Sequence, residues 1–341
     1  MKRKNIISGS VAIVIFFAMN LILGKVHIPI NEIFNILTGG EPDKMSLQHI
    51  ILQSRLPQAI TALFAGASLA TSGLLLQTLF KNPLAGPSIL GISDGANLGV
   101  ALVMLFWGNS IGINSTYMFN GSLAIIIASF TGACIILFLI VFFSGKVSNP
   151  VMLLIIGIMI GYLASSAISI LNYYSSADRV RAYVMWGMGD FSAVTNKRLP
   201  FFVICSITGI LLSVLLIKPL NALLLGEMYA TNLGINIKRT RLLILLCTGF
   251  LTATVTAFCG PISFIGLAVP HIARLILGTS NHSILLPLTI ISGACTALIC
   301  NIITVLPGSD SILPLNAVTP LIGAPVIIYV IINRKNIQYF N

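Results

Sequence analysis

The sequence predicts an all-α, polytopic membrane protein with about ten transmembrane helices in a single domain that covers residues 1–341. Three observations carry this prediction. Hydrophobic residues make up 57% of the chain and charged residues only 8%, whereas about a quarter of a soluble domain is charged. The mean hydropathy is +1.01. The apolar residues also fall into runs of about 20, the length that crosses a bilayer as a helix.

Ten segments have the length and hydropathy of a membrane span. In chain order they cover residues 6–24, 57–80, 91–107, 121–143, 150–170, 199–217, 241–258, 264–278, 284–306 and 318–332. The first follows a basic head, "MKRK", and no small-residue cleavage site comes after it. We therefore expect a retained helix rather than a signal peptide.

Two parts of this pattern contain backbone breaks. Residues 260–278 include Gly260, Pro261 and Pro270, so we expect a short helix there that is covered by protein rather than by lipid. Residues 80–99 hold two prolines and four glycines. Because the residue before a proline is displaced from the helical region, this stretch predicts a tight, bent connection between the second and third spans.

The basic residues predict the orientation. If the N-terminus is cytoplasmic, ten spans place twelve of the nineteen Lys and Arg residues on the cytoplasmic side. These twelve are Lys2, Arg3, Lys4, Lys81, Lys146, Lys218, Lys238, Arg239, Arg241, Arg274, Arg334 and Lys335. Because cytoplasmic loops accumulate Lys and Arg, we expect both termini to be cytoplasmic in a multi-pass protein of the cell (inner) membrane.

Several function classes are disfavoured by the same composition. The net charge of +11 comes from scattered residues without an aromatic-interleaved patch, so we expect no nucleic-acid partner. The six cysteines lie in apolar runs without a CxxC pair or a metal-type spacing to the four histidines, so we expect no metal site and no cofactor. A membrane-embedded enzyme would need clustered His, Asp or Glu in the spans, and the sequence has no such cluster.

The longest polar stretch of the second half is residues 219–241, on the predicted cytoplasmic side. Leucines recur at helical spacing up to Gly226, which breaks the run; Glu227 favours the start of a second short helix, and Gly234 its end. From the pattern alone two interpretations stay open. The stretch is either a knob that fits a partner's groove or an interfacial helix in the lipid headgroups.

The sequence "LLGEMYATNLGINIKRTR" in this stretch resembles the cytoplasmic coupling loop of the FecCD family, the permease subunits of ABC importers for vitamin B12, ferric siderophores and haem. Residues 55–99, 260–278, 285–288 and 318–331 are similar to that family in type and order. Together these segments cover roughly a third of the chain, a breadth that makes a chance similarity improbable.

The resemblance implies a type II ABC importer permease fold that works as a homodimer. It also implies two ATP-binding cassette ATPase subunits on the cytoplasmic side, a substrate-binding protein outside, and ATP-driven import of an iron chelate (siderophore), haem or cobalamin. The chain itself would not be an enzyme, which agrees with the absence of a GxxxxGK[ST] motif from its sequence. An ion-coupled secondary transporter is the alternative. It is disfavoured because ionisable residues in the spans are nearly confined to Asp94, His271 and Arg274.

The resemblance also implies site residues on the cytoplasmic side, with coupling helices at about residues 219–237. The ATPase-coupling residues are Leu224, Gly226, Glu227, Ala230, Leu233 and Gly234. The cytoplasmic gate residues are Asn82, Leu84, Ser148 and Asn149. Ordinary turn chemistry is the alternative for the gate positions, since Asn-Pro and Ser-Asn dipeptides mark turns in any case.

On the outer face, Arg55 matches an arginine that, in the family, pairs with a glutamate of the binding protein. A snorkelling arginine at a helix start is the alternative. The sequence departs from the family pattern at Gln58, where a second arginine is frequent, and in residues 300–310, which lack another. Further docking candidates on this face are Arg179, Arg181, Lys197 and Arg198.

Residues 175–192 lie where members of the family that this sequence resembles have a short outer helix, which helps to close the transport pathway. Four large side chains there either face the substrate or anchor the helix at the membrane interface: Tyr183, Met185, Trp186 and Met188. We favour the anchor, the usual role of Trp and Tyr at this depth.

Overall fold

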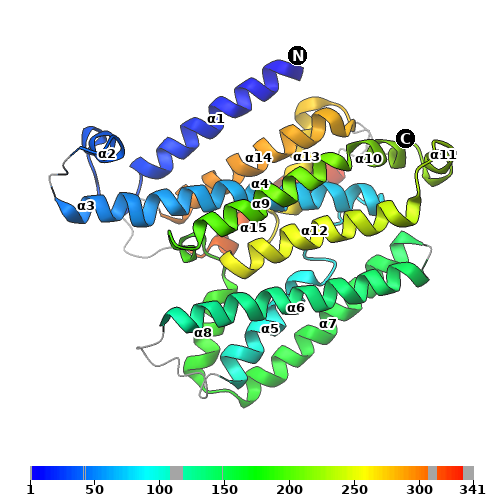
Figure 1. Cartoon of the computed structure of the whole chain (residues 1–341), viewed down its shortest axis with the longest axis horizontal. Coiled ribbons are helices and arrows are strands. Elements are labelled where there is room, and N and C mark those ends of the chain that lie inside the picture. The colour runs from blue at the N-terminus through cyan, green and yellow to red at the C-terminus, as the bar shows by residue number, and fades with distance from the viewer. Residues whose placement is uncertain are drawn as a thin grey trace.

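The computed structural model describes residues 2–40, 42, 44–107, 118–147, 149–305 and 313–332. Throughout these ranges the regular structure is helical and contains no strand, which confirms the predicted all-α class. The long helices run roughly along the longest axis of the molecule (Figure 1). The short helices α2, α3 and α8 lie toward one end of this axis, and α10 and α11 lie at the other.

Helix α4 (Leu56–Phe80) forms the centre of the fold and is buried along almost its whole length. Around it pack α9 (Leu199–Leu215), α12 (Ile237–Cys259), α13 (Ile265–Leu277) and α14 (His282–Thr304). The contact with α14 is very close, because a Cβ on Gly66 would fall 2.2 Å from the carbonyl oxygen of Gly293. Membrane helices associate through such small residues, since lipid supplies no hydrophobic driving force between them.

A second group of helices lies on the far side of α12 (Figure 1). It comprises α5 (Ile92–Ala101) with its π-helical continuation η2 (Leu102–Phe106), α6 (Met118–Lys146) and α7 (Pro150–Tyr174). Helix α5 packs on both α6 and α7, and α12 joins this group to α4 through its contacts with α6. Large apolar side chains remain exposed along α6 and α7, as expected of surfaces that face lipid or another subunit.

The N-terminal part contains two elements that the hydropathy pattern does not predict. Helix α1 (Lys2–Ile22), which corresponds to the first predicted span, packs on α14. The first unpredicted element is the short helix α2 (Ile30–Leu37), which follows α1. Helix α3 (Met45–His49) and the π-helical turn η1 (Ile50–Arg55) then continue into α4 as one helical run of 36 residues, Met45–Phe80. The predicted start at Pro57 was therefore too late.

Each of the ten predicted spans coincides with a helix, and the last of these is α15 (Leu315–Ile332). By length and composition alone, seven helices in the described residues are able to cross a membrane, or eight if α9 and the following α10 form one bent span. The apolar helices Ile92–Phe106 and Ile265–Leu277 are shorter than a full span. The exact count of ten transmembrane helices is therefore not confirmed.

Both predicted backbone breaks are present. Helix α4 ends at Lys81 in the left-handed conformation, and turns connect it to α5. Helix α13 follows a non-helical stretch that includes Phe264 at φ 66°, and it is buried against α4, α14 and α15. Two short elements, α8 (Ala177–Gly187) and the 3-10 turn η3 (Phe191–Ala193), follow α7.

Candidate coupling and gating surface

The polar stretch of residues 219–241 forms two short helices separated by a sharp turn. Helix α10 (Ile217–Leu224) continues from α9 after a bend of 50°, and α11 (Glu227–Asn232) follows Gly226. Gly226 has φ 112°, a conformation that side-chain-bearing residues rarely adopt, so glycine is required at this turn. The two-helix arrangement with a break at Gly226 was predicted correctly.

Helix α11 ends as the position of Gly234 predicted. Gly234 has φ 81°, and its N–H donates to the Thr231 carbonyl at 2.9 Å. The N–H of Ile235 donates to the Ala230 carbonyl at 3.0 Å. These two bonds form a Schellman cap, which satisfies carbonyls that the end of a helix otherwise leaves without partners.

The turn and α11 present an apolar surface, which we call the coupling knob: Leu225, Met228, Tyr229 and Leu233. Met228 is 84% exposed and is the most exposed member of the knob. Of the predicted coupling residues, Glu227, Leu233 and Gly234 are exposed, Leu224 and Gly226 are partly buried, and Ala230 is fully buried. Ala230 therefore lies on the inner side of α11, away from the exposed knob.

Helix α10 is attached to the core by both apolar and polar contacts. Leu220 and Leu223 are buried in the same cluster as residues of α4, α6 and α12. The Asn221 Oδ1 accepts the backbone N–H of His282 at 2.8 Å and lies 2.9 Å from His282 Nδ1. Since this oxygen can only accept, Nδ1 is the donor to it, and Nε2 on the other side of the ring lies 2.8 Å from the Thr78 hydroxyl. These hydrogen bonds connect α10 through the first residue of α14 to the end of α4.

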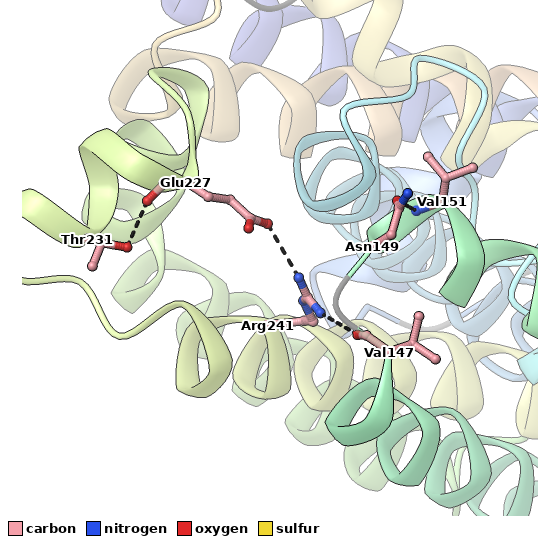
Figure 2. A network of polar contacts seen from close by, with 6 residues as sticks. All are labelled: Val147, Asn149, Val151, Glu227, Thr231 and Arg241. Atoms are coloured by element: carbon pink, nitrogen blue, oxygen red, sulfur yellow. Dashed lines mark hydrogen bonds and ion pairs between the residues drawn. The ribbon is translucent and has the colours of Figure 1, made fainter.

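Helix α11 is attached differently, through Arg241 of α12 (Figure 2). The Nη2 of Arg241 lies 3.4 Å from Glu227 Oε1, and its Nη1 donates to the carbonyl of Val147 at 3.1 Å. The Arg241 side chain is 8% exposed and that of Glu227 is 45% exposed. One buried guanidinium thus connects α11 to the residue that follows the last turn of α6.

The described gate positions lie in two connections, with Asn82 and Leu84 after α4 and Asn149 directly before α7. Asn82 accepts the N–H of Leu84 at 2.9 Å, and Asn149 accepts the N–H of Val151 at 2.9 Å as the N-cap of α7. Ser148 lies outside the described residues. Both asparagines therefore make the local turn bonds expected of their residue type. The side chain of the preceding residue, Lys81, reaches toward the coupling turn, since its Nζ lies 4.0 Å from the position that a Cβ on Gly226 would occupy.

Arg55, a predicted docking residue at the start of α4, is only 7% exposed. Its Nη1 donates to the carbonyls of Leu21 at 2.7 Å and Ile22 at 2.9 Å, and its Nη2 donates to the carbonyl of Val26. These bonds satisfy carbonyls at the end of α1 that the helix leaves free. The structure thus shows Arg55 holding the end of α1 against the start of α4, and not the exposed side chain that the docking interpretation assumes.

Gln58, which stands where an arginine is frequent, also faces inward. Its Nε2 donates to Asn301 Oδ1 at 2.9 Å, and Asn301 Nδ2 donates to Asn20 Oδ1 at 2.7 Å. This row of amides connects α4, α14 and α1. Buried amides of this kind stabilise helix contacts in a membrane because no water is present to pair with them.

The other docking candidates are more accessible. Arg181 is exposed, whereas Arg179 is partly buried and donates to the Leu105 carbonyl at 2.8 Å. Lys197 and Arg198 line a cavity of about 590 Å³ together with Gln53 and Asn196. Burial lowers the pKa of Arg198 from its ordinary value.

The four large side chains predicted on α8 separate into two groups. Tyr183 and Trp186 are stacked with ring centroids 6.3 Å apart. Burial, with a smaller contribution from the charge of Asp94, raises the pKa of Tyr183 to about 12. Met185 and Met188 line a cavity of about 210 Å³ next to the end of α14.

Besides Asn20 and Asn301, sequence reasoning missed other residues that connect elements. Near α10 and α11 they include Asn221, Arg241 and His282. Next to the end of α8, Asn316 donates to the carbonyls of Pro261 at 2.6 Å and Gly187 at 3.1 Å. Polar side chains in or beside apolar runs are the only signal that could have identified them, and that signal does not name their partners. In the described part of the chain, no three His, Cys, Asp or Glu side chains gather as a metal site.

The family model of the FecCD transport family matches residues 12–333 of the chain. The vitamin B12 import system permease protein BtuC of Klebsiella pneumoniae subsp. pneumoniae is 36% identical over 289 residues, which cover 84% of each protein. The molybdate import system permease protein MolB of Haemophilus influenzae is 35% identical over 328 residues, which cover 92% of this chain and 91% of MolB.

A solved structure is similar along its whole length. It is an inward-facing conformation of a metal-chelate type ABC transporter, with a TM-score of 0.83 and 30% identity. The match covers 98% of this chain and 99% of that one. Fold, family model and relatives agree, and the chain therefore belongs to the FecCD transport family, the membrane permeases of ABC importers.

Proposed function

We propose that two copies of this chain form the membrane channel of an importer that ATP hydrolysis on separate subunits drives. The coupling knob is the observation that carries this proposal. Four large apolar side chains protrude beside a glycine turn at one end of the molecule, and such a surface suits a groove on a partner protein. In this arrangement two ATP-binding cassette subunits bind the knobs, and both termini are cytoplasmic.

The proposed cargo is an iron chelate (siderophore), haem or cobalamin, which a binding protein delivers to the outer face. The relatives support an importer permease but do not select one cargo. BtuC is named for vitamin B12, whereas MolB, which is nearly as similar to this chain, is named for molybdate. Molybdate is therefore the second candidate. Arg181, Lys197 and Arg198 are the proposed docking residues, with Arg179; Arg55 contributes by fixing the end of α1.

The gate assignment remains a proposal for Asn82, Leu84, Ser148 and Asn149. The positions of two neighbouring residues support this proposal. The side chain of Lys81, next to Asn82, reaches toward Gly226. The carbonyl of Val147, two residues before Asn149, accepts a hydrogen bond from Arg241. Nucleotide-driven movement of the coupling helices would reach both turns directly. Such movement would open the pathway alternately to the two sides of the membrane.

The decisive experiment is reconstitution in proteoliposomes with the ATPase and the binding protein. We expect uptake that depends on ATP and on both partners, measured with labelled ferric siderophores, haem, cobalamin and molybdate as separate probes. Uptake by the chain alone under a proton or sodium gradient would instead establish the secondary transporter.

The orientation has its own test. A Met228→Cys variant carries a thiol at the most exposed knob position. In cells that produce the permease without its ATPase, we expect a membrane-impermeant thiol reagent to modify it only after permeabilisation, with the parent protein as the control for its native cysteines. Modification in intact cells would contradict a cytoplasmic knob.

A further inference from the structure

We propose that Arg241 is a positioning residue that transmits the movement of α11 to the turn between α6 and α7. This inference rests on the proposed function, in which α11 is moved by an ATPase. Figure 2 shows the arrangement: the guanidinium lies between Glu227 of α11 and Val147 at the end of α6. These contacts join segments 14 and 94 residues from Arg241 in the sequence.

The geometry suits transmission because one rigid group holds both acceptors. Nη2 faces the Glu227 carboxylate at 3.4 Å, and Nη1 donates to the Val147 carbonyl at 3.1 Å. A guanidinium is planar, and its N–H groups point in fixed directions. A displacement of Glu227 therefore turns or shifts the group, and the Val147 carbonyl experiences that change. A lysine ammonium is a single point charge and would not hold the two acceptors in a fixed mutual geometry.

Burial keeps the Arg241 side chain away from the surface of the coupling knob. Its side chain is 8% exposed, so it is shielded from a partner that covers the exposed knob. Helix α11 itself packs on α10 and α12. Arg241 extends that contact from α12 to the end of α6, which gives α11 a connection beyond the helices on which it packs.

The segment to which Arg241 would transmit this movement is the start of α7. Val147 follows the last residue of α6, Lys146, and Asn149 caps α7 by accepting the N–H of Val151 at 2.9 Å. Val147 and Asn149 are only two residues apart in the sequence, so we expect movement of the Val147 carbonyl to reach the start of α7. Helix α7 carries a long exposed apolar face, so a change at its start is passed to whatever that face contacts.

The test uses the full complex of permease and ATPase in nanodiscs, with a nitroxide label on a Val151→Cys variant in both copies. Val151 is 52% exposed, so its side chain leaves room for the label. The distance between the two labels is measured by pulsed electron paramagnetic resonance, without nucleotide and with ATP under non-hydrolysing conditions. ATP hydrolysis is measured in parallel, and neither readout requires the transported substrate.

In the otherwise unchanged protein we expect ATP to shift the distance. Arg241→Met should retain ATPase binding and hydrolysis but lose the shift, and Arg241→Lys should retain part of it. Arg239→Met is the matched control, because Arg239 lies on the same helix start and is exposed; its shift should be normal.

An unchanged shift in Arg241→Met overturns the inference. A full shift in Arg241→Lys overturns it as well, even if Arg241→Met does not assemble, because the lysine cannot hold both acceptors. Failure of the unsubstituted permease to bind an ATPase would instead refute the proposed function, so the two failures are distinguishable.

Discussion

Helices α10 and α11 are adjacent in the chain and lie at the same end of the molecule, but they are attached to it in different ways (Figure 1). Helix α10 buries Leu220 and Leu223 and is joined to α14 and α4 by the hydrogen bonds of Asn221 and His282. Helix α11 buries one residue, Ala230. Its half-exposed Glu227 carboxylate lies 3.4 Å from the Arg241 guanidinium.

This difference suggests a division of labour between the two helices. Helix α10 is fixed to the α4–α14 body, so a force on it moves that body as a unit. Helix α11 has few buried contacts, the property of segments that shift locally at low cost. Movement of one helix relative to the other would then be concentrated at Gly226, the residue between them.

The largest effect is expected at that turn. Gly226→Pro imposes a φ near −65° where the backbone has φ 112°, and it removes the N–H that donates to Leu223 at 3.1 Å. Helix α11 should be displaced while α10 keeps its attachments. We expect co-purification with the ATPase to be lost and the unfolding temperature of the permease to change little.

Gly187→Ala is a suitable control for this variant, since no atom lies within 4 Å of the added Cβ and φ at that position is not positive. A large fall in unfolding temperature for Gly226→Pro would show that α10 and α11 fold as one unit. That result would contradict the proposal that α10 and α11 are attached to the molecule independently.

A smaller effect, on stability rather than on ATPase binding, is expected at α10. Asn221→Leu leaves the backbone N–H of His282 and its Nδ1–H without their acceptor. Each unpaired buried group costs about 1–3 kcal/mol. We expect a lower unfolding temperature in detergent and an unchanged rate of ATP hydrolysis per assembled complex.

The matched control is Asn232→Leu, because Asn232 is exposed at the end of α11. Thr78→Val removes the other partner of the imidazole with little change in shape, and it should also lower the unfolding temperature. Equal unfolding temperatures for the parent and Asn221→Leu would show that this network does not fix α10.

These two helices also show what the sequence is able to predict. The turn at Gly226 and the cap at Gly234 were predicted correctly because positive φ angles favour glycine, and that requirement is local. The bonds from Thr78 to His282 and from Val147 to Arg241 span 204 and 94 residues. No local pattern encodes such pairs, so Arg241 was counted only as a cytoplasmic charge.

The same distinction explains the errors elsewhere. Pro57 is favoured at a helix start, and this local preference concealed the helical run from Met45. The π-helical turn η1 carries the chain into α4 without a break, which residue preferences do not reveal. Arg55 was placed by a family pattern on the exposed surface, whereas its position depends on carbonyls at the end of α1.

The smallest effect is expected from Glu227→Gln. The amide oxygen can still accept from Arg241, so only the charge is lost, and an ion pair with a 45% exposed carboxylate contributes less than about 1 kcal/mol. The unfolding temperature should therefore stay close to that of the parent. What should change is the salt dependence of the ATP-driven distance shift at residue 151. In the parent, raising the ionic strength from about 0.05 to 0.5 M screens the pair and reduces the shift slightly, whereas the Gln variant should show no such decrease. If both proteins respond to salt alike, the contact between α11 and Arg241 acts through packing and not through charge.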